Sequence, residues 1–150
     1  MDITPELLFP QLAAASRDEV LEKLGQAVTD RGLALDTYVQ ALKDREAEFP
    51  TGLGISGGVA IPHTSAEYVT GNTIAVATLT SPVAFQAMGD PDTTVEVSTV
   101  VMLVFADSTQ HLPLLSKIVK SLQDQSFVDA IREAASPEEL SVVLAARLGD

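Results

Sequence analysis

The sequence predicts an α/β fold, a three-layer sandwich in which helices cover both faces of a mixed β-sheet. Helical patterns occupy the beginning and the end of the chain, and strand patterns occupy the middle. Residues 95–106 are apolar almost throughout, which is typical of a central strand that is covered on both faces. A chain of 150 residues has room for a sizeable core, so we expect residues 1–150 to form a single domain.

Two helices are predicted in the first third of the chain. Ser16 and Glu19 have the spacing of a capping box, and apolar residues follow them at helical spacing. Gly32 is a typical residue for the end of this helix. Asp36 is expected to cap a second helix that runs towards Glu46.

Strands and turns fill the middle of the chain. Residues 49–58 hold four of the nine glycines and are expected to form a loop. A turn is placed at residues 88–92, where Gly, Asp and Pro are clustered. The predicted strands cover residues 59–62, 73–80, 82–85 and 95–106. Because the third of these begins with a proline, we expect it to be a short edge strand.

Three helices are predicted in the last third of the chain. The apolar stripe of residues 112–122 has helical spacing, and a short helix is expected around residues 127–131. Ser136 and Glu139 form another capping box, with Pro137 at the first helical position, which predicts a last helix through Leu148.

The composition excludes several classes of protein. Hydrophobic residues make up 46% of the chain, which excludes a disordered protein. The net charge of −12 disfavours binding to nucleic acids and to anionic membranes, because both carry negative charge. The absence of cysteine excludes disulfides and thiolate chemistry. No apolar run approaches the ~18 residues of a membrane-spanning helix and no signal segment is present, so we expect a cytoplasmic protein without direct membrane insertion.

His63 is the sharpest candidate for chemistry, because its sequence neighbourhood is free of charge. Residues 49–66 contain no Asp, Glu, Lys or Arg, although the chain holds 21 acidic residues. A nearby carboxylate would favour a protonated imidazole and would repel an incoming phosphoryl group. His63 also follows a short strand, and ligands of α/β proteins bind at strand ends. The alternative is that His63 is only a strand-end residue bonded to the backbone.

Two further residues are candidates for binding an anion. His111 is expected in the first turn of a helix, where free N–H groups attract anions, and the alternative is an incidental surface histidine. Arg45 carries a guanidinium that can grip phosphate oxygens, and the alternative is a solvated residue paired with Asp44 or Glu46. The two histidines lie far apart in the sequence without ordered carboxylates, so no metal site is expected.

A glycine pattern in the loop resembles a cofactor motif only in its spacing. Gly52, Gly54 and Gly57 have the spacing of a dinucleotide-binding motif. They precede a strand, whereas that motif follows a strand and opens a helix. We therefore expect no cofactor.

Two segments resemble a known family. Residues 45–52 (Arg-Glu-Ala-Glu-Phe-Pro-Thr-Gly) and 58–63 (Gly-Val-Ala-Ile-Pro-His) resemble the enzyme IIA domains of the fructose–mannitol class, which belong to the bacterial phosphoenolpyruvate-dependent sugar phosphotransferase system. The resemblance extends over nearly the whole chain and includes His111 and the leucines after it. It implies a relay in which a histidine phosphocarrier protein phosphorylates the IIA histidine. IIA then passes the phosphoryl group to a cysteine of the IIB component, and the permease phosphorylates the sugar.

The resemblance also implies the roles of individual residues. His63 falls on the phosphorylated histidine, His111 on a second active-site histidine and Arg45 on the family's arginine. The residues expected to line the phosphate site are Thr51, Gly58 and Thr64. The relay needs neither a metal nor a cofactor, and it involves no nucleic acid.

Departures from the family pattern bear on the substrate. Thr64 stands where fructose and mannitol members usually have glycine, and residues 45–52 and 83–86 are closer to the galactitol-type branch. We therefore expect galactitol or a related polyol first and fructose or mannitol second. The alternative function is a regulatory IIA-like module whose phosphorylation state controls partner proteins. A third possibility is a binding protein in which His63 does no chemistry.

Overall fold

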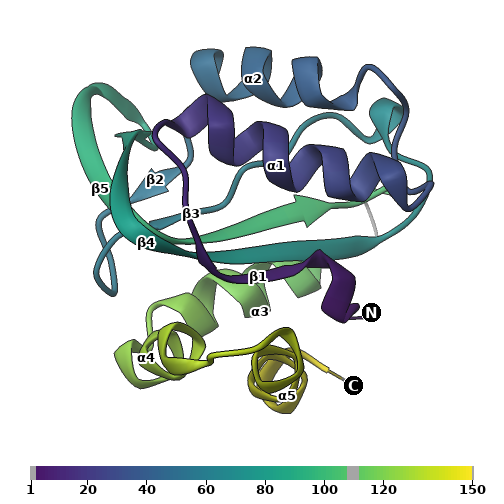
Figure 1. Ribbon diagram of the computed structural model, residues 1–150. Coiled ribbons are helices and arrows are strands. Elements are labelled where there is room, and N and C mark those ends of the chain that lie inside the picture. The colour runs from purple at the N-terminus through teal and green to yellow at the C-terminus, as the bar shows by residue number, and fades with distance from the viewer. Residues whose placement is uncertain (1–2, 108–111, 150) are drawn as a thin grey trace.

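Two long antiparallel strands form the centre of the fold, β4 (Thr73–Ala87) and β5 (Asp90–Val104) (Figure 1). The computed structural model describes residues 3–107 and 112–149. The two strands predicted at 73–80 and 82–85 are one strand, whose register shifts between Thr78 and Val83 where residues 80–82 are exposed. The predicted turn at 88–92 is shorter in the structure, because Asp90 already belongs to β5.

Three short strands complete a mixed sheet around this hairpin. Strand β1 (Leu8–Leu12) is parallel to β4, and β3 (Val59–Ala60) is parallel to β5. Strand β2 (Gly52–Leu53) is antiparallel to β3 and also meets the end of β4, where Gly52 lies opposite Ala87. The sequence did not predict β1, and β2 lies inside the segment that was expected to be a loop.

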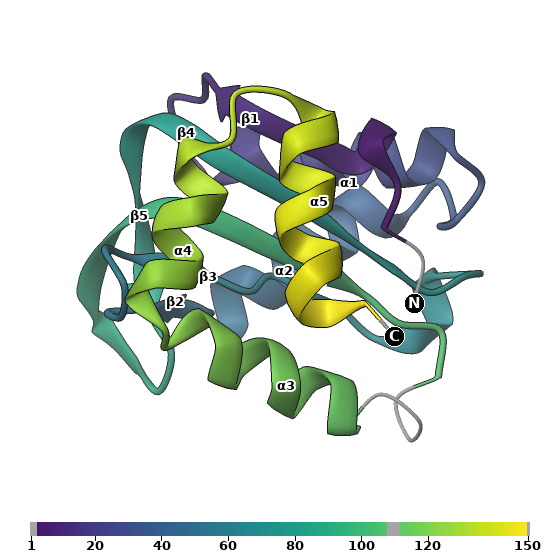
Figure 2. The same ribbon diagram turned by 90° about the horizontal axis from the view of Figure 1, so that it is seen from below.

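The helices form two layers, as predicted. Helices α1 (Arg17–Asp30) and α2 (Tyr38–Glu48) cover one face of the sheet. Helices α3 (Leu112–Leu122), α4 (Gln125–Glu133) and α5 (Pro137–Leu148) cover the other face (Figure 2). A separate hydrophobic core fills the space between the sheet and each layer. The three-layer α/β sandwich with a mixed sheet is therefore confirmed.

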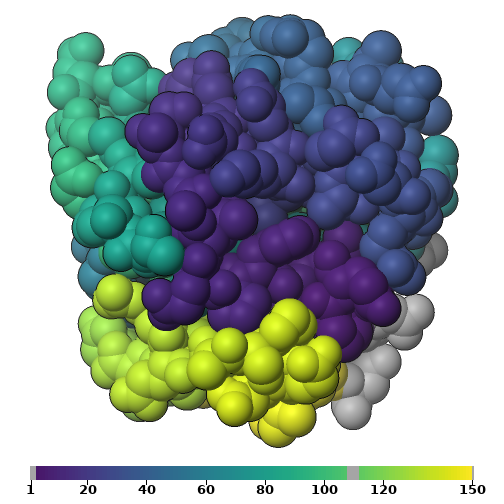
Figure 3. Space-filling view, in the orientation of Figure 1, coloured from purple at the N-terminus to yellow at the C-terminus, as the bar shows by residue number. Residues whose placement is uncertain are grey.

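The N-terminal segment packs against the C-terminal helix. A short 3₁₀ helix, η1 (Pro5–Leu7), leads into β1, and both elements pack against α5. Figure 3 shows this segment in purple lying directly over the yellow C-terminal helix. Within the described ranges, none of the helices combines the length and apolar character needed to cross a bilayer.

The helix caps agree with the sequence except at α2. Ser16 accepts a hydrogen bond from the Glu19 N–H at 3.2 Å, and Ser136 accepts one from the Glu139 N–H at 3.1 Å. The prediction that Asp36 caps the second helix is wrong, because the N-cap position is Thr37 and no side chain caps the helix. The Leu35 N–H donates to the Tyr68 carbonyl, and the Leu35 carbonyl accepts from the Tyr38 N–H in a turn that leads directly into α2.

Gly58 occupies a position that only glycine fits. Its φ is +93°, and a Cβ there would collide with the carbonyl oxygen of Glu96 on β5. Gly54 in the same loop has open space around it and no positive φ. The glycine at position 58 thus permits the close approach of β3 to β5.

We predict that Gly58→Ala destabilises the protein by at least about 2 kcal/mol, because the new methyl group strains the backbone and pushes β5 away. The matched control Gly54→Ala should change the free energy of unfolding by less than about 1 kcal/mol. Denaturant unfolding of both variants measures the difference. Equal stability of the two variants would contradict this account of β3.

Candidate functional site

His63 lies at the end of the β3 segment, beside the last residues of β5. After β3, the Pro62 carbonyl accepts a hydrogen bond from the Leu103 N–H at 2.9 Å, so the chain keeps following β5 up to His63. The His63 side chain is half-buried and lines a surface cavity of about 380 Å³. The lining residues come from the loop after His63, the end of β5 and the start of α3: Thr64, Ser65, Ala66, Leu103, Phe105, Leu112 and Leu115. The ring is thus reachable from outside through a mainly apolar opening.

A backbone hydrogen bond fixes the His63 ring. Its Nδ1 lies 2.9 Å from the carbonyl oxygen of Ile61. A carbonyl oxygen only accepts hydrogen bonds, so Nδ1 carries the proton in this contact. In the neutral ring Nε2 then holds the free electron pair. Among the described residues, no hydrogen-bond partner occupies Nε2.

A buried carboxylate lies behind the site, and the sequence analysis missed it. Glu46 on α2 is 1% exposed and Thr51 is 2% exposed. The Thr51 N–H donates to Oε2 of Glu46 at 2.7 Å, and the Thr51 hydroxyl donates to Oε1 at 2.8 Å. Burial raises the pKa of Glu46, while the hydrogen bonds from Thr51 and the charge of Arg17 act in the opposite direction. The carboxylate therefore fastens the end of α2 to the start of the glycine-rich segment.

Arg45 is held by an aromatic ring and not by a carboxylate. Its guanidinium carbon lies 4.4 Å from the centre of the Phe49 ring. Its Nε is buried without a hydrogen-bond partner. Within the described part of the chain Arg45 forms no ion pair, so the expected alternative of a pair with Asp44 or Glu46 is wrong. The guanidinium keeps its charge uncompensated by any such contact.

The remaining predicted residues lie in different places. Thr64 lines the His63 cavity, whereas Thr51 is buried and does not line it. The Thr51 carbonyl accepts from the Ile61 N–H at 3.4 Å. Gly58 lies at the opposite end of β3 from His63, where its carbonyl accepts from the Ser98 N–H at 3.0 Å. His111 lies outside the described residues.

Comparisons with known proteins identify the family. A sequence profile described as "Phosphoenolpyruvate-dependent sugar phosphotransferase system, EIIA 2" matches residues 2–146. The chain belongs to this family. A mannitol-specific phosphotransferase enzyme IIA component from Staphylococcus aureus is 36% identical to this EIIA chain over 136 residues, 91% of this chain and 90% of that protein. A galactitol-specific EIIA component from Escherichia coli O6:H1 is also 36% identical, over 121 residues and 80% of each protein.

A solved structure shows that the fold is shared. It is a complex of mannitol enzyme IIA with phosphorylated enzyme IIB from Escherichia coli, and its matching chain superposes on this EIIA chain with a TM-score of 0.79. The match covers 97% of this chain and 99% of that chain at 24% sequence identity. The family resemblance stated from the sequence is confirmed by the profile match and by the relatives at 36% identity.

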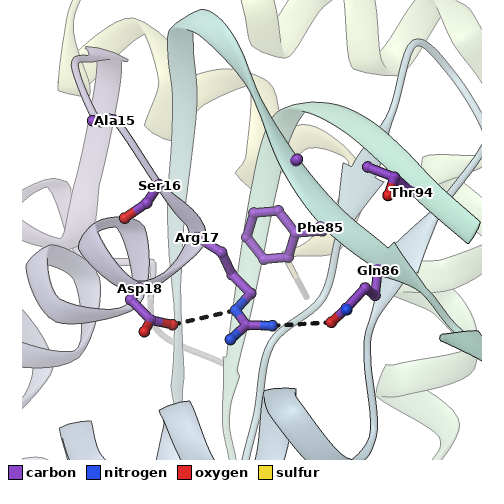
Figure 4. A pocket seen from close by; sticks show the side chains of 8 residues that line it. Ala15, Ser16, Arg17, Asp18, Phe85, Gln86 and Thr94 are labelled. Carbon is purple, nitrogen blue, oxygen red and sulfur yellow. Dashed lines mark hydrogen bonds and ion pairs between the residues drawn. The ribbon is translucent and has the colours of Figure 1, made fainter. Parts of the chain in front are cut away.

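A second cavity of the EIIA chain, of about 440 Å³, lies where α1 begins (Figure 4). Arg17 crosses it and donates to Asp18 at 3.2 Å and to Gln86 at 3.1 Å. Unlike Arg45, this arginine already has hydrogen-bond partners. No three acidic or histidine side chains within the described ranges are grouped as metal ligands.

The raised pKa of Glu46 leads to a prediction about stability and pH. A carboxyl group whose pKa is higher in the folded state favours folding most when it is protonated. Its favourable contribution is complete below the unfolded pKa, which is near ~4.3, and is lost as the pH rises through the folded value. Relative to wild type, Glu46→Gln should therefore gain stability as the pH rises across this window, because glutamine does not ionise.

Denaturant unfolding of the wild type and of Glu46→Gln at a series of pH values measures this difference. The exposed Glu48→Gln is the control, since Glu48 lies in the same helical turn and shows no such burial. A Glu46→Gln difference that stays constant with pH would contradict the burial effect.

Proposed function

We propose that this EIIA chain accepts a phosphoryl group on Nε2 of His63 from the histidine phosphocarrier protein and passes it to a cysteine of the IIB component. The observation that carries the proposal is the His63 ring itself. It lines an accessible cavity, its Nδ1 is occupied by the Ile61 carbonyl, and its Nε2 has no partner among the described residues. A neutral imidazole held in this way is a ready nucleophile.

Two transfers make up the proposed relay. In the first, the electron pair of Nε2 forms a bond to phosphorus while the bond between phosphorus and the donor's imidazole nitrogen breaks, and that nitrogen recovers its electron pair. In the second, the IIB thiolate sulfur forms a bond to phosphorus while the bond to Nε2 breaks. The ring gains positive charge when phosphorus is attached, and the hydrogen bond from Nδ1 to Ile61 stabilises that charge.

The surroundings suit this transfer. Phosphoryl transfer depends mainly on alignment and on positive charge near the equatorial oxygens. Among the described residues Arg45 has no competing carboxylate, and the family resemblance implies that Arg45 and His111 supply this charge. The apolar residues Leu103, Phe105 and Leu112 line the same cavity as the ring and offer few polar groups to hold water there.

We infer the partners and the substrate class from the relatives. The matching solved structure is a IIA–IIB complex, which supports IIB as the acceptor. The relatives at 36% identity are named for mannitol and for galactitol, which supports a six-carbon polyol as the transported substrate. Both names denote sugar-specific components, and this favours transport over the regulatory alternative. A cytoplasmic location follows from this role, since the phosphocarrier acts there.

We predict that His63→Ala abolishes phosphoryl acceptance, because no other ring occupies its place. Incubation with phosphoenolpyruvate, enzyme I and the phosphocarrier should add ~80 Da to the wild type, as one acid-labile phosphoryl group. Ser141→Ala on α5, a residue that does not line the His63 cavity, is the control and should gain the same mass. Full phosphorylation of His63→Ala would refute the assignment, and no gain in the wild type would refute the function.

We predict that Arg45→Ala slows phosphoryl acceptance by roughly 10²–10³-fold, the loss seen when one charge-stabilising donor is removed. His111→Ala should also slow transfer while leaving the protein folded. The matched control is Arg147→Ala. Arg147 also stacks on a phenylalanine, Phe127 at 5.0 Å, but is paired with Asp124 at 3.0 Å on the other side of the sheet. Rapid-quench measurements give the rates, and equal rates for Arg45→Ala and Arg147→Ala would contradict the role of Arg45.

A further inference from the structure

A continuous path of hydrogen bonds connects the buried Glu46 carboxylate to the His63 ring. The carboxylate accepts both donors of Thr51, at 2.7 and 2.8 Å. The Thr51 carbonyl accepts the Ile61 N–H at 3.4 Å. The Ile61 carbonyl in turn accepts Nδ1 of His63 at 2.9 Å. Ile61 is therefore held from both sides, by Thr51 through its N–H and by His63 through its carbonyl.

Stability alone is a poor reason for a carboxylate at this position. Burial of an ionisable group costs free energy, and a well-packed apolar side chain in the same place would avoid that cost. The burial is strong enough to raise the pKa of Glu46. Arg17 acts on Glu46 only through its field, since its hydrogen bonds go to Asp18 and Gln86 (Figure 4).

The geometry of the carboxylate gives a more specific reason. An ionised carboxylate only accepts hydrogen bonds, so it fixes the directions of the Thr51 N–H and of the Thr51 hydroxyl together. A residue held at both its backbone and its side chain has little freedom to turn its carbonyl. The Thr51 carbonyl bonds to the Ile61 N–H, and the Ile61 carbonyl bonds to the His63 ring.

We propose that Glu46 is a positioning residue for the phosphoryl acceptor: through Thr51 and Ile61 it holds Nδ1 of His63 protonated and Nε2 directed into the cavity. This inference rests on the proposed function of His63. Glu46 does not touch the reacting atoms, and it acts only through the chain of contacts described above.

Because Glu46 and Thr51 are buried, their effect on His63 can be distinguished from an effect on partner binding. Glu46 is 1% and Thr51 2% exposed, so neither side chain reaches a docked carrier protein. A loss of positioning should therefore lower kcat for phosphoryl acceptance and leave KM for the carrier unchanged. A displacement of the reacting atom by about 1 Å costs up to roughly 10²-fold in rate, which sets the scale of the effect.

The experiment compares Glu46→Gln, Thr51→Val and Thr51→Ser. Glutamine keeps the shape of Glu46 but offers one acceptor oxygen in place of two, and valine keeps the shape of Thr51 without its hydroxyl. We expect both to lower kcat by about 10- to 100-fold at unchanged KM. Serine restores the hydroxyl, so Thr51→Ser should stay within about 2-fold of the wild type. Denaturant unfolding confirms that each variant is folded at the assay temperature.

The ¹⁵N resonances of the His63 ring give a readout that does not depend on phosphoryl transfer. For the neutral ring of the wild type they should show the proton on Nδ1. In Glu46→Gln and Thr51→Val the two nitrogen shifts should move towards each other as the second tautomer becomes populated. A purely structural role would lower the unfolding midpoint without moving either kcat or the ring resonances.

The possible outcomes test the role of Glu46 separately from the phosphoryl relay through His63. Wild-type kcat and unchanged ring resonances in both variants, or a rise in KM alone, would overturn the role of Glu46 while the relay through His63 stands. Failure of the wild type to accept phosphate overturns the relay, and the ring resonances still report whether Glu46 sets the tautomer. A kcat close to the wild type in Thr51→Ser together with a lowered kcat in Thr51→Val is the result that supports the inference.

Discussion

The pairing of β4 with β5 is the constraint on which the other elements depend. Residues 73–79 and 97–104 are buried almost without interruption, because helices cover both faces of this part of the sheet. Strand β1 attaches to β4, β3 attaches to β5, and β2 connects β3 to the far end of β4. The backbone before His63 is placed by this sheet, because it follows β5 as far as Leu103.

Most of the fold was predictable because local patterns and tertiary structure agree. The capping boxes at Ser16 and Ser136 and the apolar run of β5 are local sequence patterns that predict their elements. Strands β1 and β2, which the sequence did not predict, have no such pattern. Strand β1 has only five residues and contains Pro10, which weakens the strand pattern, and β2 has two residues in a glycine-rich segment. Both strands form because they pair with other strands of the sheet, and a short stretch of sequence does not reveal such pairing.

The candidate site was predictable in part for the same reason. The charge-free stretch around His63 is a local feature, so the sequence singled out this residue. The sequence suggested Glu46 only as a helix residue that could pair with Arg45, because its contact with Thr51 forms only when the chain folds back after α2. The contact between Arg45 and Phe49 had a local signal, since residues four apart face each other on a helix.

The way Arg45 is held has a consequence for the kinetics of any anion that meets it. An arginine engaged with an aspartate or glutamate must break that pair before it grips a phosphate, and the cost appears as a reorganisation barrier. The Phe49 ring lies against the guanidinium, and no carboxylate in the described ranges pairs with it. In a protein with a net charge of −12, this is a site where a negative group can arrive without displacing another. Stacking on Phe49 thus orients the Arg45 guanidinium in advance, whereas an ion pair would also neutralise its charge.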